Sequence, residues 1–86
     1  MPTIGRIGSF AVMIFRNDHG IPHFHVFGDD FSAKFAILDF AMLSSKGRIR
    51  RRDIKAIEAW GQKHQTELYL NWELAVAGQP AQKIED

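Results

Sequence analysis

The sequence contains no cysteine, and this lack removes two classes of site. Disulfide bonds and thiolate zinc centres both require cysteine side chains, so neither is open to this chain. A chain without cysteine is also compatible with a reducing compartment, and we therefore expect a cytoplasmic protein. A divalent metal, if one binds, must rely on histidine and carboxylate ligands.

Long apolar runs are missing as well. The longest run, Phe10–Phe15, is six residues, whereas a membrane-spanning helix needs about twenty and a signal peptide about seven to fifteen. The sequence therefore predicts neither a membrane segment nor a signal peptide. The chain of 86 residues is long enough for one domain, and its hydrophobic share of 45% argues against intrinsic disorder.

The net charge of +1 says little about partners, but the charge is unevenly distributed. Residues 46–55 hold six basic side chains and one acidic one. Within this run Arg50, Arg51 and Arg52 precede a predicted helix, at the end where the helix dipole and unpaired amides attract anions. These arginines are candidate phosphate-binding residues. The alternative is a solvated basic turn.

The first half of the chain has the pattern of β-strands. Residues 9–16 and 23–28 are rich in strand-forming side chains, and residues 31–40 alternate between apolar and polar positions. A fourth short strand is expected around residues 41–44. The short connections carry turn-forming Asn, Asp and Gly, which predicts antiparallel neighbours. The expected fold is α+β, with a three- to four-stranded antiparallel meander followed by a helix.

The second half of the chain has helical periodicity. Apolar or small residues recur at steps of three and four from Arg51 onward, and they predict a long or bent helix of some 25 residues. This stripe comprises Ile54, Ile57, Gly61, His64, Leu68, Trp72 and Ala75. Gly61 lies in mid-helix, so either the helix bends there or another group packs closely against it. Residues 1–78 are expected to form one domain, and residues 79–86 a flexible tail.

Three of the four histidines lie in the segment NDHGIPHFHVFG. On an extended strand His23, His25 and Phe27 point to one face, and the intervening residues point to the other. Imidazoles two residues apart stand about 6.5–7 Å apart, a spacing used by two-histidine metal sites and by phosphate-handling enzymes. His23 and His25 are therefore candidate metal ligands, catalytic groups or anion-binding groups. The alternative is a half-exposed pair with only a packing role.

The turn before this strand supplies further candidates. Asp18 and His19 are placed to add a third metal ligand or a carboxylate that orients an imidazole. His64 on the helix completes a three-histidine site only if the helix covers the histidine-bearing face. The phenylalanine pattern favours the opposite arrangement, in which His64 has a structural role. Trp60 and Trp72 are expected in the core.

The first predicted strand is apolar on both faces, whereas one helix covers only one face of a sheet. The other face is therefore expected to be partly open, with Met13 or Ile14 beside His23, His25 and Phe27. Open apolar faces are uncommon on soluble monomers. This face is a candidate site for self-association, for a partner protein or for nucleic acid.

The segments NDHGIPHFHV and NWELAVAGQP resemble small bacterial proteins grouped as domain of unknown function 4160, whose signature is Asp-His-x-Pro-Pro-His-Phe-His. The resemblance spans Met1 to Ile84, and its signature positions here are Asp18, His19, Pro22, His23 and His25. Ile21 departs from the family, which commonly has proline at this position. The resemblance implies a toxin–antitoxin-like or regulatory gene pair, and hence a partner protein. It implies no reaction and no established cofactor.

Together these patterns predict a small cytoplasmic regulatory or toxin–antitoxin-like module. It would bind a partner protein or nucleic acid through the histidine-bearing face and through Arg50–Arg52. One alternative is a small nuclease in which His23 or His25 is the general acid or base and the arginines hold the phosphate. The other is a metal-binding protein with His23, His25 and His19 as ligands. Whether the chain is an enzyme is left open.

Overall fold

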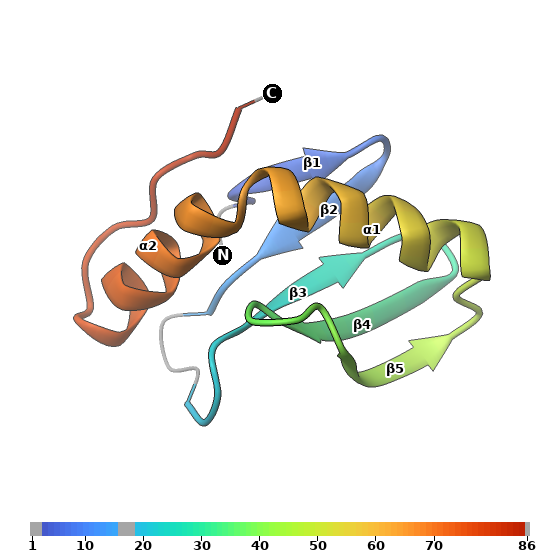
Figure 1. The fold of residues 1–86 in the computed structure, drawn as a ribbon, viewed down its shortest axis with the longest axis horizontal. Helices are drawn as coiled ribbons and strands as arrows, with labels where there is room; N and C mark the ends of the chain where they lie inside the picture. Colours follow the sequence, from blue (N-terminus) through green and yellow to red (C-terminus); the bar gives the residue numbers. More distant parts are fainter. Residues whose placement is uncertain (1–2, 16–18, 86) are drawn as a thin grey trace.

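The computed structural model describes residues 3–15 and 19–85 (Figure 1). Within these residues the chain forms five strands and then two helices. They are β1 Gly5–Ile7, β2 Phe10–Met13, β3 His23–Phe27, β4 Phe31–Ala36, β5 Met42–Gly47, α1 Arg51–Lys63 and α2 Gln65–Val76. The strands form one antiparallel sheet in the order β1-β2-β3-β4-β5, so each strand pairs with its neighbour in the chain. The predicted α+β class and meander are confirmed.

The prediction of three or four strands was too low, because β1 was not recognised. β1 is only three residues long and begins with Gly5, so it has too few side chains to show a period of two. Pairing with β2 identifies it, through Gly5 opposite Val12 and Ile7 opposite Phe10. The predicted third strand was too long, because a turn begins after Ala36 and the chain continues into β5.

The single long helix that the periodicity predicted is interrupted at His64, which separates α1 from α2. The backbone of His64 leaves helical geometry, with φ −116° and ψ 22°. Its N–H still bonds to Trp60 O and Gly61 O, and its own carbonyl accepts the N–H of Leu68. The break therefore preserves the apolar stripe, and every predicted stripe residue from Ile57 to Ala75 is buried.

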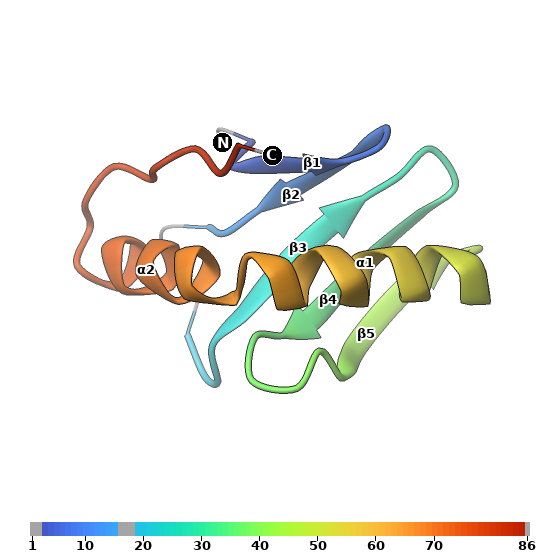
Figure 2. The ribbon, with the colours of Figure 1, turned by 45° about the horizontal axis from the view of Figure 1, so that its top comes forward.

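Both helices lie on the same face of the sheet (Figure 2). The side chains between the two layers form the core. It includes the fully buried Val12, Phe24, Val26, Phe35, Ile57 and Leu68, with Trp60 and Trp72 almost buried. The expected core positions of the two tryptophans are thus confirmed. We call this side of the sheet the covered face.

Gly61 is explained by a close approach. A Cβ built on Gly61 would lie 2.5 Å from Cε1 of Phe40, so only glycine leaves room for that ring. Phe40 follows the turn after β4 and has a positive φ of 60°, which is uncommon for a residue with a side chain. Its ring also contacts Phe24, at 6.3 Å between centroids. The helix therefore has glycine here because the β4–β5 connection packs against it.

Residues 79–85 have no regular secondary structure, but they pack against the domain. Ile84 is 5% exposed, and its N–H bonds to Ile4 O. Asn71, which is buried on α2, donates to Gln82 O at 2.9 Å and accepts from Gln82 N at 2.8 Å. The sequence predicts a flexible tail here, whereas these contacts attach the segment to α2 and to the edge of β1 (Figure 2).

None of the helices in the described part of the chain is long and apolar enough to cross a membrane.

Candidate binding surface

The sheet has a second face, opposite the helices. In β3, Phe24 and Val26 are fully buried on the covered face, whereas His25 and Phe27 are only half-buried on the other side. The register across the sheet extends this second side over four strands. We call it the open face, and it comprises Met13, Phe15, His25, Phe27, Ser32, Lys34, Ser44 and Lys46, with Arg6 and Ala11 toward β1.

Three rings form a cluster on the β2–β3 half of the open face. Phe15 contacts His25 edge to face, with ring centroids 4.4 Å apart, and its centroid is 6.3 Å from that of Phe27. The rings of His25 and Phe27 are within 7° of parallel, with centroids 6.3 Å apart. We call these three side chains the aromatic cluster. Planar faces of this kind suit stacking with another flat ring.

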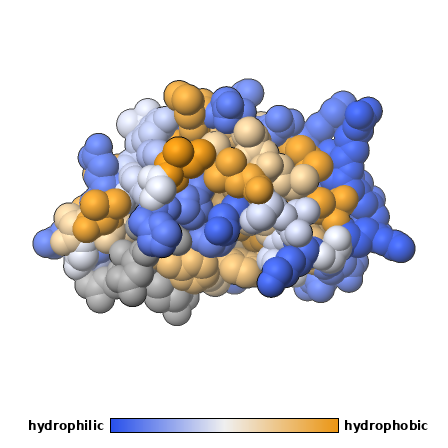
Figure 3. All heavy atoms as spheres, turned by 90° about the horizontal axis from the view of Figure 1, so that it is seen from below, coloured by the Kyte–Doolittle hydropathy of each residue, from blue (hydrophilic) through white to orange (hydrophobic). Residues whose placement is uncertain are grey.

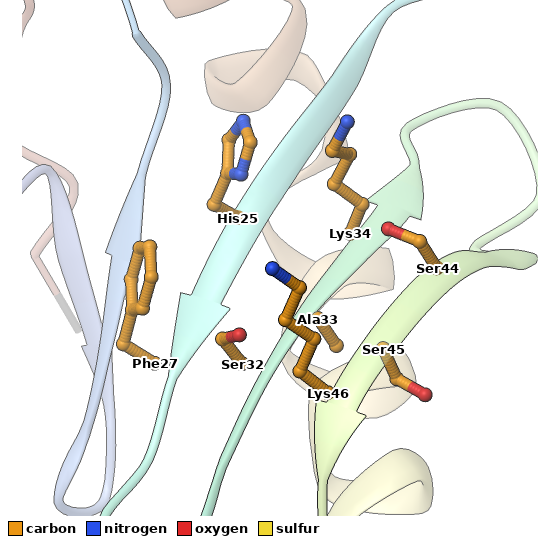
Figure 4. Close-up of a pocket in the computed structure, with 8 residues that line it drawn as sticks. All are labelled: His25, Phe27, Ser32, Ala33, Lys34, Ser44, Ser45 and Lys46. Carbon is orange, nitrogen blue, oxygen red and sulfur yellow. The ribbon is translucent and has the colours of Figure 1, made fainter.

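Two lysines stand next to this cluster on the β4–β5 half. Lys34 pairs across the strands with His25 and with Ser44, and Lys46 pairs with Ser32. These side chains, with Phe27 and Ser45, line a hollow of about 140 Å³. Figure 4 shows them rising from three neighbouring strands, with the amino group of Lys46 extending from β5 over β4. The hollow therefore joins the aromatic cluster to two ammonium groups.

Charge is segregated between the sheet and the rest of the described chain. The five strands contain three charged residues, Arg6, Lys34 and Lys46, and all three are basic. The register places all of them on the open face. The described carboxylates lie instead on turns, helices and the C-terminal segment: Asp29, Asp30, Asp39, Asp53, Glu58, Glu67, Glu73 and Glu85. No strand within the described ranges places a carboxylate beside the lysines, so the open face favours anions.

His23 and His25 lie close together but in different environments. Their ring centroids are 5.2 Å apart, yet His23 is 5% exposed and its ring lies 5.0 Å from that of Trp72 on α2. Nδ1 of His23 lies 2.8 Å from Ile21 O. Because a carbonyl only accepts, this bond places a proton on Nδ1. Because His23 is buried, His25 is the one of the two histidines that contributes to the exposed part of the open face.

His64 lies on the other side of the sheet. It is 4% exposed, its ring contacts Trp60, and its Nδ1 donates to Oε1 of Glu67 at 2.7 Å. The helices cover the face of Phe24 and Val26, as the phenylalanine pattern predicted, so His64 is separated from His25 by the sheet. The described residues bring together no group of three or more His, Asp or Glu side chains that fits a metal ion.

The turn before β3 carries two further residues that the sequence predicted for the site, His19 and Asp18. His19 is exposed and lies outside the strands. Asp18 is outside the described residues. Its predicted role as a third ligand or orienting carboxylate therefore stays a prediction.

The three arginines lie at the start of α1, beyond β5. Asp53, on the first turn, accepts the backbone N–H of Arg50 at 3.0 Å, and its other oxygen is 3.7 Å from Nε of Arg52. Asp53 thus forms the acidic half of a capping box and places a negative charge beside two of the three arginines. Arg50, Arg52, Asp29 and Asp30 line one hollow, where opposite charges largely cancel. Arg51 is exposed on the helix.

Three residues of the open face, Lys34, Lys46 and Phe15, were not predicted as site residues from the sequence. The signal for Lys34 was present, because it alternates with the buried Ala33 and Phe35 in β4. Lys46 carried no such signal, because all residues of β5 are exposed and the strand has no buried phase. Its place beside Ser32 depends on the β4–β5 register, which contains an irregularity between Lys34 and Phe35.

Seen from below, the surface places hydrophobic side chains next to hydrophilic ones (Figure 3). A comparison with protein families matches residues 9–73, well over half of the chain, to a domain of unknown function, DUF4160. This match includes β2 to α1 and most of α2. No curated protein and no solved structure matches the chain.

Proposed function

Because the chain belongs to the DUF4160 family, whose description assigns no activity, we propose a function from geometry: a module that binds an anionic ligand on its open face. Lys34 and Lys46 supply the charge, and Ser32 and Ser44 supply hydroxyl groups between them. Ammonium and hydroxyl groups are the donors that phosphate oxygens accept in proteins. The ligand then lies across β3, β4 and β5.

This proposal rests on the distribution of charge, because the charged residues of the strands are all basic and all lie on the open face. A lysine on an edge strand is commonly explained as protection against pairing with other sheets, and this explanation suffices for Lys46 on β5. It does not explain Lys34, because β4 is an interior strand with β3 on one side and β5 on the other. Two cations beside one hollow, with no acidic residue on the neighbouring strands, match a ligand with several negative charges.

The test compares two double variants with equal net charge. Lys34→Gln with Lys46→Gln removes the two cations of the open face, whereas Lys55→Gln with Lys83→Gln removes two exposed cations elsewhere. The probe is a fluorescently labelled inorganic polyphosphate, measured by anisotropy at low salt. We expect at least tenfold weaker binding for the first variant and little change for the second.

The salt dependence gives a second measurement. For a flexible polyanion, the slope of log K against log salt concentration is negative, with a magnitude of roughly 0.7 for each phosphate contact. Removing both lysines should therefore reduce the magnitude of the slope by about 1.4. Equal effects of the two double variants would refute the proposal, as would failure of the native chain to bind at low salt.

Three predictions from the sequence concern the same surface and stay predictions. Self-association or a toxin–antitoxin-like partner protein on this face would compete with the anion. Light scattering with and without polyphosphate shows whether the anion changes the assembly state. A nuclease needs a general acid and a general base near the scissile phosphate. Only His25 of the predicted pair reaches the exposed part of the face, which ranks catalysis below binding. A release of nucleotides that His25→Ala abolishes would reverse that ranking.

A further inference from the structure

We propose that the anionic ligand of the open face is a single-stranded nucleic acid. Its bases would stack on the aromatic cluster, and its phosphates would contact Lys34 and Lys46. This inference rests on the proposed function and adds the aromatic half of the surface to it. Lys34 is the direct cross-strand partner of His25, so the charged and aromatic halves are contiguous.

The aromatic cluster is the feature that a simple anion leaves unused. Phosphate, polyphosphate and acidic peptides pair with lysine but gain nothing from planar rings beside it. A nucleotide carries both a phosphate and a flat base, and proteins bind single strands by combining a cationic track with aromatic stacking platforms. The parallel faces of His25 and Phe27, and Phe15 beside them, supply such a platform.

The shape of the surface distinguishes a single strand from a duplex. Five strands at about 4.8 Å spacing make a sheet about 19 Å wide, whereas the major groove of B-DNA is about 12 Å wide. The open face therefore does not enter a groove. In a duplex the base faces are stacked on one another, so they are not available to Phe15 or Phe27. A single strand exposes both its bases and its phosphates to a flat sheet.

The arrangement also gives the direction and size of the site. The aromatic cluster lies on β3 and just beyond the end of β2, and the lysines lie on β4 and β5, so the ligand runs across the strands rather than along them. Two lysines and three rings match a short ligand, at the low end of the roughly four to sixteen nucleotides that small single-strand binding domains cover. RNA and DNA share this chemistry.

The experiment measures anisotropy of labelled eight-nucleotide ligands in four forms: single-stranded RNA, single-stranded DNA, an abasic strand with the same phosphates, and duplex DNA. We expect either single strand to bind roughly 5- to 150-fold more tightly than the abasic strand, the range given by stacking of one base. RNA and DNA binding alike, or RNA binding more tightly through its 2′-hydroxyl, both fit the proposal.

Variants then separate the two halves of the site. Phe27→Leu should weaken binding of the single strand and leave the abasic strand unchanged, whereas Lys34→Gln with Lys46→Gln should weaken both. Phe10→Leu is the matched control, because Phe10 packs on the covered side against Phe31 and should change neither affinity. Ring protons of Phe27 should also shift on titration with the single strand, which a purely structural role would not cause.

The outcomes also separate this inference from the proposed function. Equal affinity for the abasic and the complete strand would overturn the inference and keep the anion site. Tighter binding of the duplex would overturn it as well. Failure of every ligand to bind at low salt would overturn both.

Discussion

The two faces of the sheet use the same kinds of side chain for different purposes. On the covered face phenylalanine pairs with phenylalanine, as in Phe24 opposite Phe35, and both are fully buried. On the open face phenylalanine pairs with serine, as in Phe27 opposite Ser32, and histidine pairs with lysine. Residue type alone therefore does not distinguish the covered face from the open face, whereas the cross-strand neighbours do.

The largest difference between the faces is expected in stability. Phe24→Ala removes a fully buried ring and should lower the free energy of unfolding by about 3–5 kcal/mol. Phe27→Ala removes a half-buried ring, whose site solvent can fill, and should lower it by less than half as much. Urea unfolding followed by tryptophan fluorescence measures both. Equal losses would mean that the open face is part of the core, and the comparison would fail.

The two edges of the sheet differ in a similar way, because residues 82–84 shield β1 and nothing described shields β5. Asn71 holds this segment with two side-chain hydrogen bonds to the backbone of Gln82, and a third bond to Glu67 O fixes the Asn71 side chain on α2. Asn71→Ala should lower the free energy of unfolding by about 1–3 kcal/mol, because it removes a buried group and its bonds. Faster hydrogen exchange at the Ile84 amide would accompany this loss.

The neighbouring Glu73→Ala is the control for this variant. Glu73 is exposed on α2 and should change stability by no more than about 0.5 kcal/mol. An unaltered Ile84 exchange rate in Asn71→Ala would contradict the assignment of Asn71 as the residue that holds the segment.

The covered face also depends on a close contact between Gly61 and Phe40. Gly61→Ala gains about 1 kcal/mol in helix propensity, but its Cβ meets the Phe40 ring, and overpacking costs about 1–3 kcal/mol. We therefore expect a net loss of about 1 kcal/mol. In the double variant with Phe40→Leu the clash should be smaller, so the two changes should not add. A stabilised Gly61→Ala would show that the ring moves without cost.

Part of this fold follows directly from the sequence. Alternation in β4 predicted its buried face, and steps of three and four predicted the buried stripe of both helices, because those signals depend only on local spacing. β1 and the break at His64 were not predictable in the same way. A three-residue strand has no measurable period, and the break keeps the stripe in phase, so neither changes the pattern.

The candidate site was predicted less completely than the fold. His25 and Phe27 were identified from their place on one strand. Lys34 and Lys46 were not, because the β3–β4 pairing is what places Lys34 beside His25 and the β4–β5 pairing is what places Lys46 beside Ser32. His23 was assigned to the same surface by alternation, but packing by Trp72 buries it. Local spacing predicts the face of the sheet toward which a side chain points. Tertiary contacts then decide whether that side chain is exposed to solvent.

The smallest effect on the free energy of unfolding is expected for the two lysines, which carry much of the charge that distinguishes the open face. Lys34→Gln and Lys46→Gln alter solvent-facing side chains without opening a cavity, so the double variant should keep its free energy of unfolding within about 0.5 kcal/mol of the native value. The same variant is expected to lose anion binding. Unchanged stability would therefore show that this loss of binding does not come from unfolding. Urea unfolding at two salt concentrations measures it. A marked gain in stability at low salt only would show that the two lysines repel each other in the native chain, a cost that a bound anion would remove.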